Sequence, residues 1–330
     1  MTSNPTRVRR LNLRAVLVLS ACVVVAAASL LALNARRGRS GRQALLKEAR
    51  ACRELQHIDL ALAYLDRCLA LDHGDLEALE IKADILAGRA RSEEQITEAI
   101  AVHTLLLGLD PENPSRNQTR TRLAELNLRI PGRARAAEAL ARELLRRGDD
   151  NAVAHRLLAE SLEAAGRDGD RDALQEALRE YEAARRLDPR DEAAAVRLSA
   201  LLDEPLKRGE DALRVLDDLV ATNRDQPRRL ASAYLARARF HARRRERDQT
   251  RAELDRAAEA AVDDPEIRLD AAEIAVGVGD VEAGRKFLRG LSDAKVEPLR
   301  VKLVEGRIDY LEHRPDDAVH SWREGLLLTG

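Results

Sequence analysis

Aromatic residues are scarce in this chain of 330 residues, which has two phenylalanines, one tryptophan and four tyrosines. Alanine, leucine and valine supply most of a hydrophobic content of 45%. A core of such small side chains lets helix backbones approach closely. The composition therefore favours thin layers of paired helices over a single thick core, arranged as two compact domains or as one elongated array.

Metal-binding and catalytic motifs are also missing. The three cysteines form no CxxC pair and the seven histidines are scattered, so no metal site is predicted. No GxxxxGKS/T, GxGxxG, HExxH or GxSxG motif occurs. Adjacent carboxylates such as Asp217 and Asp218 point to different helix faces, which suits capping and solvation rather than catalysis. We predict a non-enzymatic protein with no cofactor and no small-molecule substrate.

An excess of charge of one sign is absent, since 56 Lys and Arg residues stand against 57 Asp and Glu residues. A nucleic-acid-binding protein would need a concentrated basic surface, so this class is not predicted. The one basic run of the body extends from Arg237 to Arg247. We interpret it as a helix end with its following turn, where positive charge suits the helix dipole. Binding of acidic lipid or of an acidic partner is the alternative.

Long apolar runs are absent except at residues 15–33, which begin at Ala15, end at Leu33 and carry no charged side chain. At about 1.5 Å per residue a helix of this length spans roughly 28 Å, close to the hydrocarbon thickness of a bilayer. We predict a transmembrane helix; a cleaved signal peptide, whose apolar core is usually about 7–15 residues, is the alternative. The expected domains are a basic tail (1–14), the transmembrane helix (15–33), a linker (34–41) and the body (42–330).

The body carries an internal repeat of helical pattern. Alanines recur at the same place in each repeat, at successive intervals of 38, 37, 41, 35, 40, 31 and 35 residues: Ala61, Ala99, Ala136, Ala177, Ala212, Ala252, Ala283 and Ala318. Apolar residues near them recur at three-and-four spacing, which indicates helices. The pairs Asp110-Pro111 and Asp188-Pro189 end such helices, because proline disfavours helical geometry in the residue before it.

Each of these alanines belongs to the second helix of a pair. A small residue 12 positions earlier marks the first helix, as in Ala49 with Ala61, Ala271 with Ala283 and Gly306 with Ala318. Two antiparallel helices can touch where both side chains are small. Each repeat is therefore predicted to be a helical hairpin.

Two cysteines fall in the first predicted hairpin. Cys52 lies late in one helix and Cys68 late in the next, whereas Cys22 lies within residues 15–33. The ends of antiparallel helices lie apart, further than the roughly 7 Å between alpha carbons that a disulfide allows. We expect both thiols to stay free and buried.

This pattern resembles the tetratricopeptide repeat (TPR) family, whose unit is a helix–turn–helix of about 34 residues. The resemblance implies an all-α fold, a right-handed α-solenoid of about eight TPR-like hairpins. The third repeat, near 124–148, and the sixth, near 231–264, are degenerate. The aromatic positions of the family are mostly Leu or His here, at Leu45, Leu65, His103 and His155.

The resemblance also implies a groove for a protein or peptide, lined by the first helices. The residues at groove positions are Arg50, Arg53, Glu80, Asp84, Glu125, Arg156, Glu160, Arg239 and Arg307. Some relatives grip a terminal carboxylate with asparagines and lysines. Arg50, Asp84 and Glu125 stand at the asparagine positions, so the sequence predicts a different, polar partner.

The predicted function is a membrane-anchored scaffold for protein–protein interaction, in a bacterial inner membrane with the body on the extracytoplasmic side. The alternative is a regulatory or assembly region of a larger polypeptide whose catalytic part lies beyond Gly330 or in a partner; an enzyme with an unrecognised site is a third class. A solenoid needs a polar cap on its last apolar face. We therefore expect a continuation of the chain, or a partner, to cover the apolar end at Leu326, Leu327 and Leu328.

Overall fold

The computed structural model describes residues 41–166, 170–291 and 296–328. Within these ranges the chain forms sixteen helices and no strand, as the repeat pattern predicts. The apolar segment 15–33 lies outside the described residues. Among those that are described, no helix is both long enough and apolar enough to span a bilayer.

The chain divides into two compact units, residues 1–122 and 123–330. In the first unit, a helix of residues 41–54 is followed by α2 (Ile58–Leu71), α3 (Leu76–Arg89) and α4 (Glu93–Leu109). The first part of α5 (Arg116–Leu128) completes it. The helix of residues 41–54 and α2 share a core that includes Leu46, Leu65 and Ile81 of α3.

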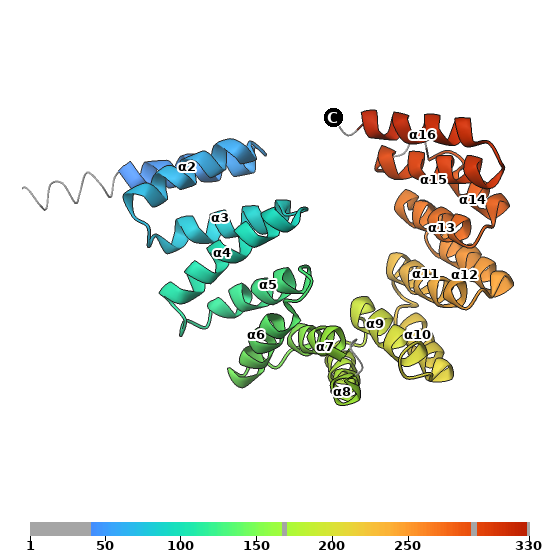
Figure 1. The fold of residues 1–330 in the computed structure, drawn as a ribbon, viewed down its shortest axis with the longest axis horizontal. Coiled ribbons are helices and arrows are strands. Elements are labelled where there is room, and N and C mark those ends of the chain that lie inside the picture. The colour runs from blue at the N-terminus through green and yellow to red at the C-terminus, as the bar shows by residue number, and fades with distance from the viewer. Residues whose placement is uncertain (1–40, 167–169, 292–295, 329–330) are drawn as a thin grey trace, which may run out of the picture. The chain divides into compact units, whose positions relative to one another are not determined.

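The second unit begins within α5 and consists of helical hairpins. Its helices are α6 (Ala134–Arg146), α7 (Ala152–Gly166), α8 (Arg171–Leu187), α9 (Glu192–Asp203), α10 (Gly209–Thr222), α11 (Pro227–Arg243), α12 (Arg247–Ala260), α13 (Pro265–Gly277), α14 (Val281–Leu288), α15 (Pro298–Leu311) and α16 (Pro315–Leu327). The odd-numbered helices from α7 to α15 contact one another in succession, and each also packs on the even-numbered helix before and after it. Figure 1 shows α9, α11, α13 and α15 following one another, with α10 and α12 to their right and α16 above α15.

Helix starts follow from acidic and hydroxyl caps in the connections. The Asp75 carboxylate accepts a hydrogen bond from the Ala78 amide, and Asp191 does the same for Ala194. Ser92 forms a reciprocal capping box with Gln95 at the start of α4. Such caps satisfy amide groups that have no partner within the helix. The capping residues in these connections therefore fix where the following helices begin.

The predicted small-residue contacts are confirmed in three hairpins. Ala49, Ala61, Ala271 and Ala318 have no exposed surface, and Ala283 has 1%. A methyl group at Gly306 would lie 2.3 Å from Nε1 of Trp322, well inside contact distance. The close helix approach therefore depends on the missing side chain.

The predicted register is wrong by one residue in the third and sixth repeats. Ala136 is exposed and its neighbour Ala137 is fully buried. Ala252 is likewise exposed, while Glu253 is buried and its carboxylate lies 3.2 Å from the Arg237 guanidinium. The sixth hairpin thus places an ion pair at its small-residue position, which the alanine spacing alone does not reveal.

The predictions for the cysteines and for the basic run are confirmed. Cys52 and Cys68 are buried free thiols in the core of the first unit. The run from Arg237 to Arg247 contains the end of α11 and the turn before α12. Four of its six arginines form ion pairs with carboxylates, as when Arg244 bonds to Asp203 at 2.9 Å. A single array over residues 42–330 and its right-handed superhelix stay predictions.

Candidate partner-binding site

All nine predicted groove residues lie on the first helices of their hairpins: Arg50 and Arg53 on residues 41–54, Glu80 and Asp84 on α3, Glu125 on α5, Arg156 and Glu160 on α7, Arg239 on α11, and Arg307 on α15. Five of them are exposed, namely Arg50, Arg53, Glu80, Asp84 and Arg307. The other four are half-buried, which differs from the exposure predicted for them. Two of these four, Arg156 and Arg239, form ion pairs with residues of the next hairpin.

In the second unit these ion pairs join one first helix to the next. The Arg156 guanidinium lies 3.3 Å from the carboxylate of Asp191, the capping residue of α9. It also bonds to Glu160 on its own helix at 3.0 Å. Arg239 of α11 lies 3.6 Å from Asp270 of α13. These charged side chains connect neighbouring repeats.

Arg300 is the most highly connected of these arginines. From α15 it reaches three acids of α13, with distances of 3.0 Å to Glu266, 2.6 Å to Asp270 and 2.9 Å to Glu273. The hydrogen bond to Glu273 is the largest cause that raises the pKa of Arg300 above its ordinary value. The arginine therefore stays charged and fixes α15 against α13.

The first unit uses its groove positions in the same way. Arg50 forms an ion pair with Glu77 of α3, and Glu80 forms one with Arg116 of α5. Arg116 is buried and also lies 3.8 Å from Asp110. Arg53, Asp84 and Arg307 take part in no ion pair within the described part of the chain, so they remain available for a partner.

A small polar cavity of about 200 Å³ lies beside Glu80 and Asp84. His103 of α4 forms one wall; its side chain is buried and neither ring nitrogen makes a hydrogen bond. Burial lowers the pKa of His103, although Asp84 and the nearby Ala83 carbonyl act in the opposite direction. The imidazole is therefore neutral near pH 7.

His103→Phe is expected to reduce the pH dependence of unfolding. The folded pKa lies below the unfolded value, so stability present above about pH 6.5 is lost as the pH falls toward the folded pKa. Between pH 7.5 and 5.5 the wild type should lose up to about 1 kcal/mol more than the variant in urea unfolding. His73→Gln, at an exposed position, should follow the wild type. Equal slopes for wild type and His103→Phe would contradict the buried neutral state.

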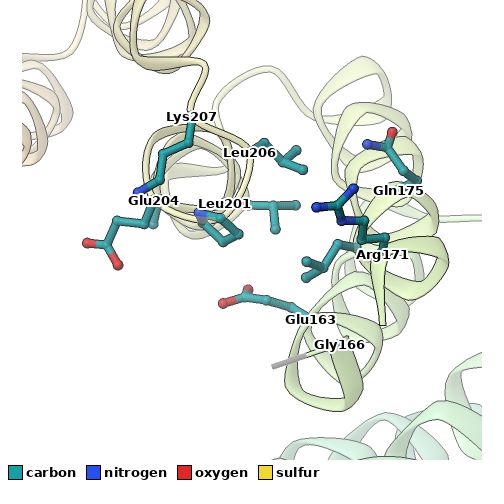
Figure 2. Close-up of a pocket in the computed structure, with 11 residues that line it drawn as sticks. Glu163, Gly166, Arg171, Gln175, Leu201, Glu204, Leu206 and Lys207 are labelled. Carbon is teal, nitrogen blue, oxygen red and sulfur yellow. The ribbon is translucent and has the colours of Figure 1, made fainter. Parts of the chain in front are cut away.

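A larger cavity of about 910 Å³ lies where α7, α8 and the end of α9 meet. Figure 2 shows Arg171 reaching from α8 toward Leu206, with Glu163 of α7 and Glu204 at other sides of the space. Residues 167–169, which connect α7 to α8 at this point, lie outside the described ranges. The cavity is thus no candidate site.

An apolar cavity of about 680 Å³ lies on α13, α15 and α16. Its walls include Leu303, Tyr310, Leu311 and Trp322, and Arg307 lies among them. Arg307 is the one predicted groove residue that lines this cavity, and its unpaired charge lies among exposed apolar side chains. As for metal ions, the described residues contain no cluster of three His, Cys, Asp or Glu side chains that could hold one.

Sequence reasoning did not find the acidic partners of the groove arginines. Asp191, Asp270 and Arg300 were not among the predicted site residues, and neither was His103, which was noted only as a departure from an aromatic position. The usable signal was the acid that caps the start of α9, Asp191, together with Glu266, Asp270 and Glu273, whose spacing of four and three residues puts them on one face of α13. Which acid faces which arginine depends on the packing of neighbouring hairpins.

No protein-family model matches this chain, and no curated protein matches it. Among solved structures, a TPR protein from Parabacteroides merdae ATCC 43184 is similar, with 15% identity, a TM-score of 0.50, and coverage of 77% of this chain and 93% of the other. MamA from Desulfovibrio magneticus RS-1 covers 56% of this chain and 97% of its own, with 17% identity and a TM-score of 0.48. A thermophilic TPR protein from Thermus thermophilus covers 56% and 92%, with 21% identity and a TM-score of 0.44.

The likeness to the Parabacteroides protein extends over most of both chains. The described helices also pair and stack as TPR hairpins do. The chain therefore has the TPR fold, which confirms the fold that its repeat pattern implies.

Proposed function

We propose that this protein is a non-enzymatic scaffold that binds protein segments through its first helices. The observation that carries the proposal is the TPR fold, whose first helices stack in layers. Arg53, Asp84 and Arg307 lie on first helices and form no ion pair with any described residue. Layers of this kind offer an extended surface for a polypeptide. Half-buried ion pairs connect neighbouring first helices of the second unit, and the three unpaired charges are groups that a partner of opposite charge can bind.

The proposal includes an anchor at residues 15–33, in a bacterial inner membrane with the body on the extracytoplasmic side. Its support is the sequence, because 19 uncharged positions flanked by arginines suit a single span. An anchored scaffold would hold its partner at high local concentration near the lipid surface.

Charge reversal on the two sides of one hairpin tests the binding face. Arg53→Glu changes the first helix and Arg67→Glu changes the second helix, α2; both side chains are exposed and neither forms an ion pair with a described residue. In proximity labelling of cells that express the full chain, Arg53→Glu should reduce partner labelling several-fold, whereas Arg67→Glu should not. Equal losses in the two variants would refute a binding face on the first helices.

Extraction of membranes with alkaline carbonate tests the anchor. The full chain should stay with the membrane fraction at its full length, because a transmembrane helix resists release. Recovery of a shortened chain in the supernatant would favour the cleaved signal peptide instead.

A further inference from the structure

The apolar cavity at the hairpin of α15 and α16 is lined in part by residues whose counterparts in the preceding hairpin are buried. Gly306 of α15 corresponds to Ala271 of α13, since each lies 12 residues before the small residue of its second helix. By this register Arg307, Tyr310 and Leu311 correspond to Ala272, Ala275 and Val276. Those three residues of α13 are no more than 1% exposed, whereas Tyr310 is 61% and Leu311 37% exposed.

The shape of the exposed surface follows from helix geometry. Leu303, Arg307 and Leu311 are four residues apart and lie one above the other on α15. Tyr310 and Trp322 flank this row, and the Trp322 indole is held by a hydrogen bond of 3.3 Å to the Leu303 carbonyl. The row therefore presents one guanidinium between two apolar side chains.

Two charged residues at or beside the cavity, Glu273 and Lys302, are neutralised by ion pairs. Glu273 at the cavity wall bonds to Arg300 at 2.9 Å, and Lys302 of α15 bonds to Glu305 and Glu324 at 2.9 and 3.0 Å. Arg307 alone among the cavity residues carries a charge with no partner in the described part of the chain. A two-fold contact with a second copy of this surface would bring two such arginines into one interface whose only carboxylate, Glu273, is already paired, which disfavours that occupant.

We propose that this surface binds an acidic amphipathic helix of a partner protein, with a carboxylate one turn from apolar side chains on either side. The same positions are buried among helices in the preceding hairpin, and the one-turn spacing of Leu303, Arg307 and Leu311 matches the side-chain spacing of a helix. Arg307 selects an acid, because a charge-assisted hydrogen bond from its guanidinium to a carboxylate is stronger than one to a neutral group. Aromatic and arginine anchors in a partly enclosed site are typical of the residues that dominate protein interfaces. The inference rests on the scaffold function proposed above and names the kind of partner.

The single tryptophan gives a direct readout. The full chain, labelled with 5-fluorotryptophan and held in lipid nanodiscs, has one fluorine resonance, from Trp322. The probe is an alanine-based peptide of about 18 residues, long enough to form a helix, with Leu, Glu and Leu at successive one-turn spacings. A matched peptide has Gln in place of Glu. We expect the Glu peptide to shift the resonance and to bind about tenfold more tightly than the Gln peptide.

Two variants test the role of the arginine. Arg307→Glu should bind the Glu peptide at least about tenfold more weakly and should instead prefer a peptide with Lys at that position, a gain that a misfolded chain cannot show. Arg323→Glu, on an exposed residue of α16 outside the cavity, should bind as the wild type does.

Three results would overturn the inference: no shift with any peptide, equal affinity for the Glu and Gln peptides, or an unchanged preference in Arg307→Glu. A shift that grows with protein concentration in the absence of peptide would identify a second copy as the occupant. The test at Arg53 concerns a different unit of the chain, so this inference and the general binding face can fail separately.

Discussion

Ala177→Arg is expected to lower the free energy of unfolding of the second unit by more than about 3 kcal/mol. Ala177 is fully buried in α8, in a core that includes Leu157, Leu178 and Tyr181. Adding a long side chain to a filled core costs about 1–3 kcal/mol, and burying an unpaired charge adds to that. The measurement is urea unfolding of the full chain followed by circular dichroism at 222 nm.

The matched control for this substitution lies on the same helix. Glu182→Arg introduces an arginine at an exposed position of α8, where substitutions usually change stability by less than about 0.5 kcal/mol. Similar unfolding curves for Ala177→Arg and Glu182→Arg would mean that α8 does not face α7 as described.

Gly284→Ala is expected to destabilise the seventh hairpin by about 1–3 kcal/mol, although alanine favours a helix more than glycine does. A methyl group at this position would lie 2.4 Å from Cγ2 of Val276, which is buried, and 3.5 Å from Ile308. The helices α13 and α14 would have to separate. Thermal unfolding of the full chain measures the loss.

A double-mutant cycle isolates this contact. Val276→Ala removes the methyl group that blocks the site, so the double variant should be more stable than the sum of the two single losses predicts. Gly277→Ala, at a glycine with no neighbouring atom within 4 Å, should be neutral or slightly stabilising. Additive losses in the cycle would show that Gly284 is not needed for close packing against Val276.

Much of the fold could be predicted because one signal repeats. The spacing of small residues identifies the hairpins, and pairs such as Ala271 with Ala283 lie buried as expected. The signal fails where a repeat departs from it. Two adjacent alanines, Ala136 and Ala137, fit the pattern equally well, and only packing decides that the second turns inward. At Glu253 a carboxylate takes the place of the small residue, and Arg237 of the preceding helix neutralises it.

The candidate site was harder to predict, because exposure and pairing are properties of neighbouring hairpins. The sequence placed Arg156 and Arg239 on first helices correctly, yet both are half-buried beside carboxylates of the next repeat. Arg307 was named with the others, but its distinct environment depends on Trp322 of the following helix. No pattern within a single helix contains that information.

The ion pairs between first helices make the second unit sensitive to dissolved ions. Arg300 is tied to three carboxylates of α13, and these contacts are partly open to solvent. Electrolyte weakens attraction between exposed charges, with a screening length of about 8 Å at physiological ionic strength. Concentrated salt should therefore lower the restoring force that keeps α15 at its present angle to α13. The stiffness of the contact between α13 and α15 therefore depends on the ionic strength of the solution as well as on side-chain packing.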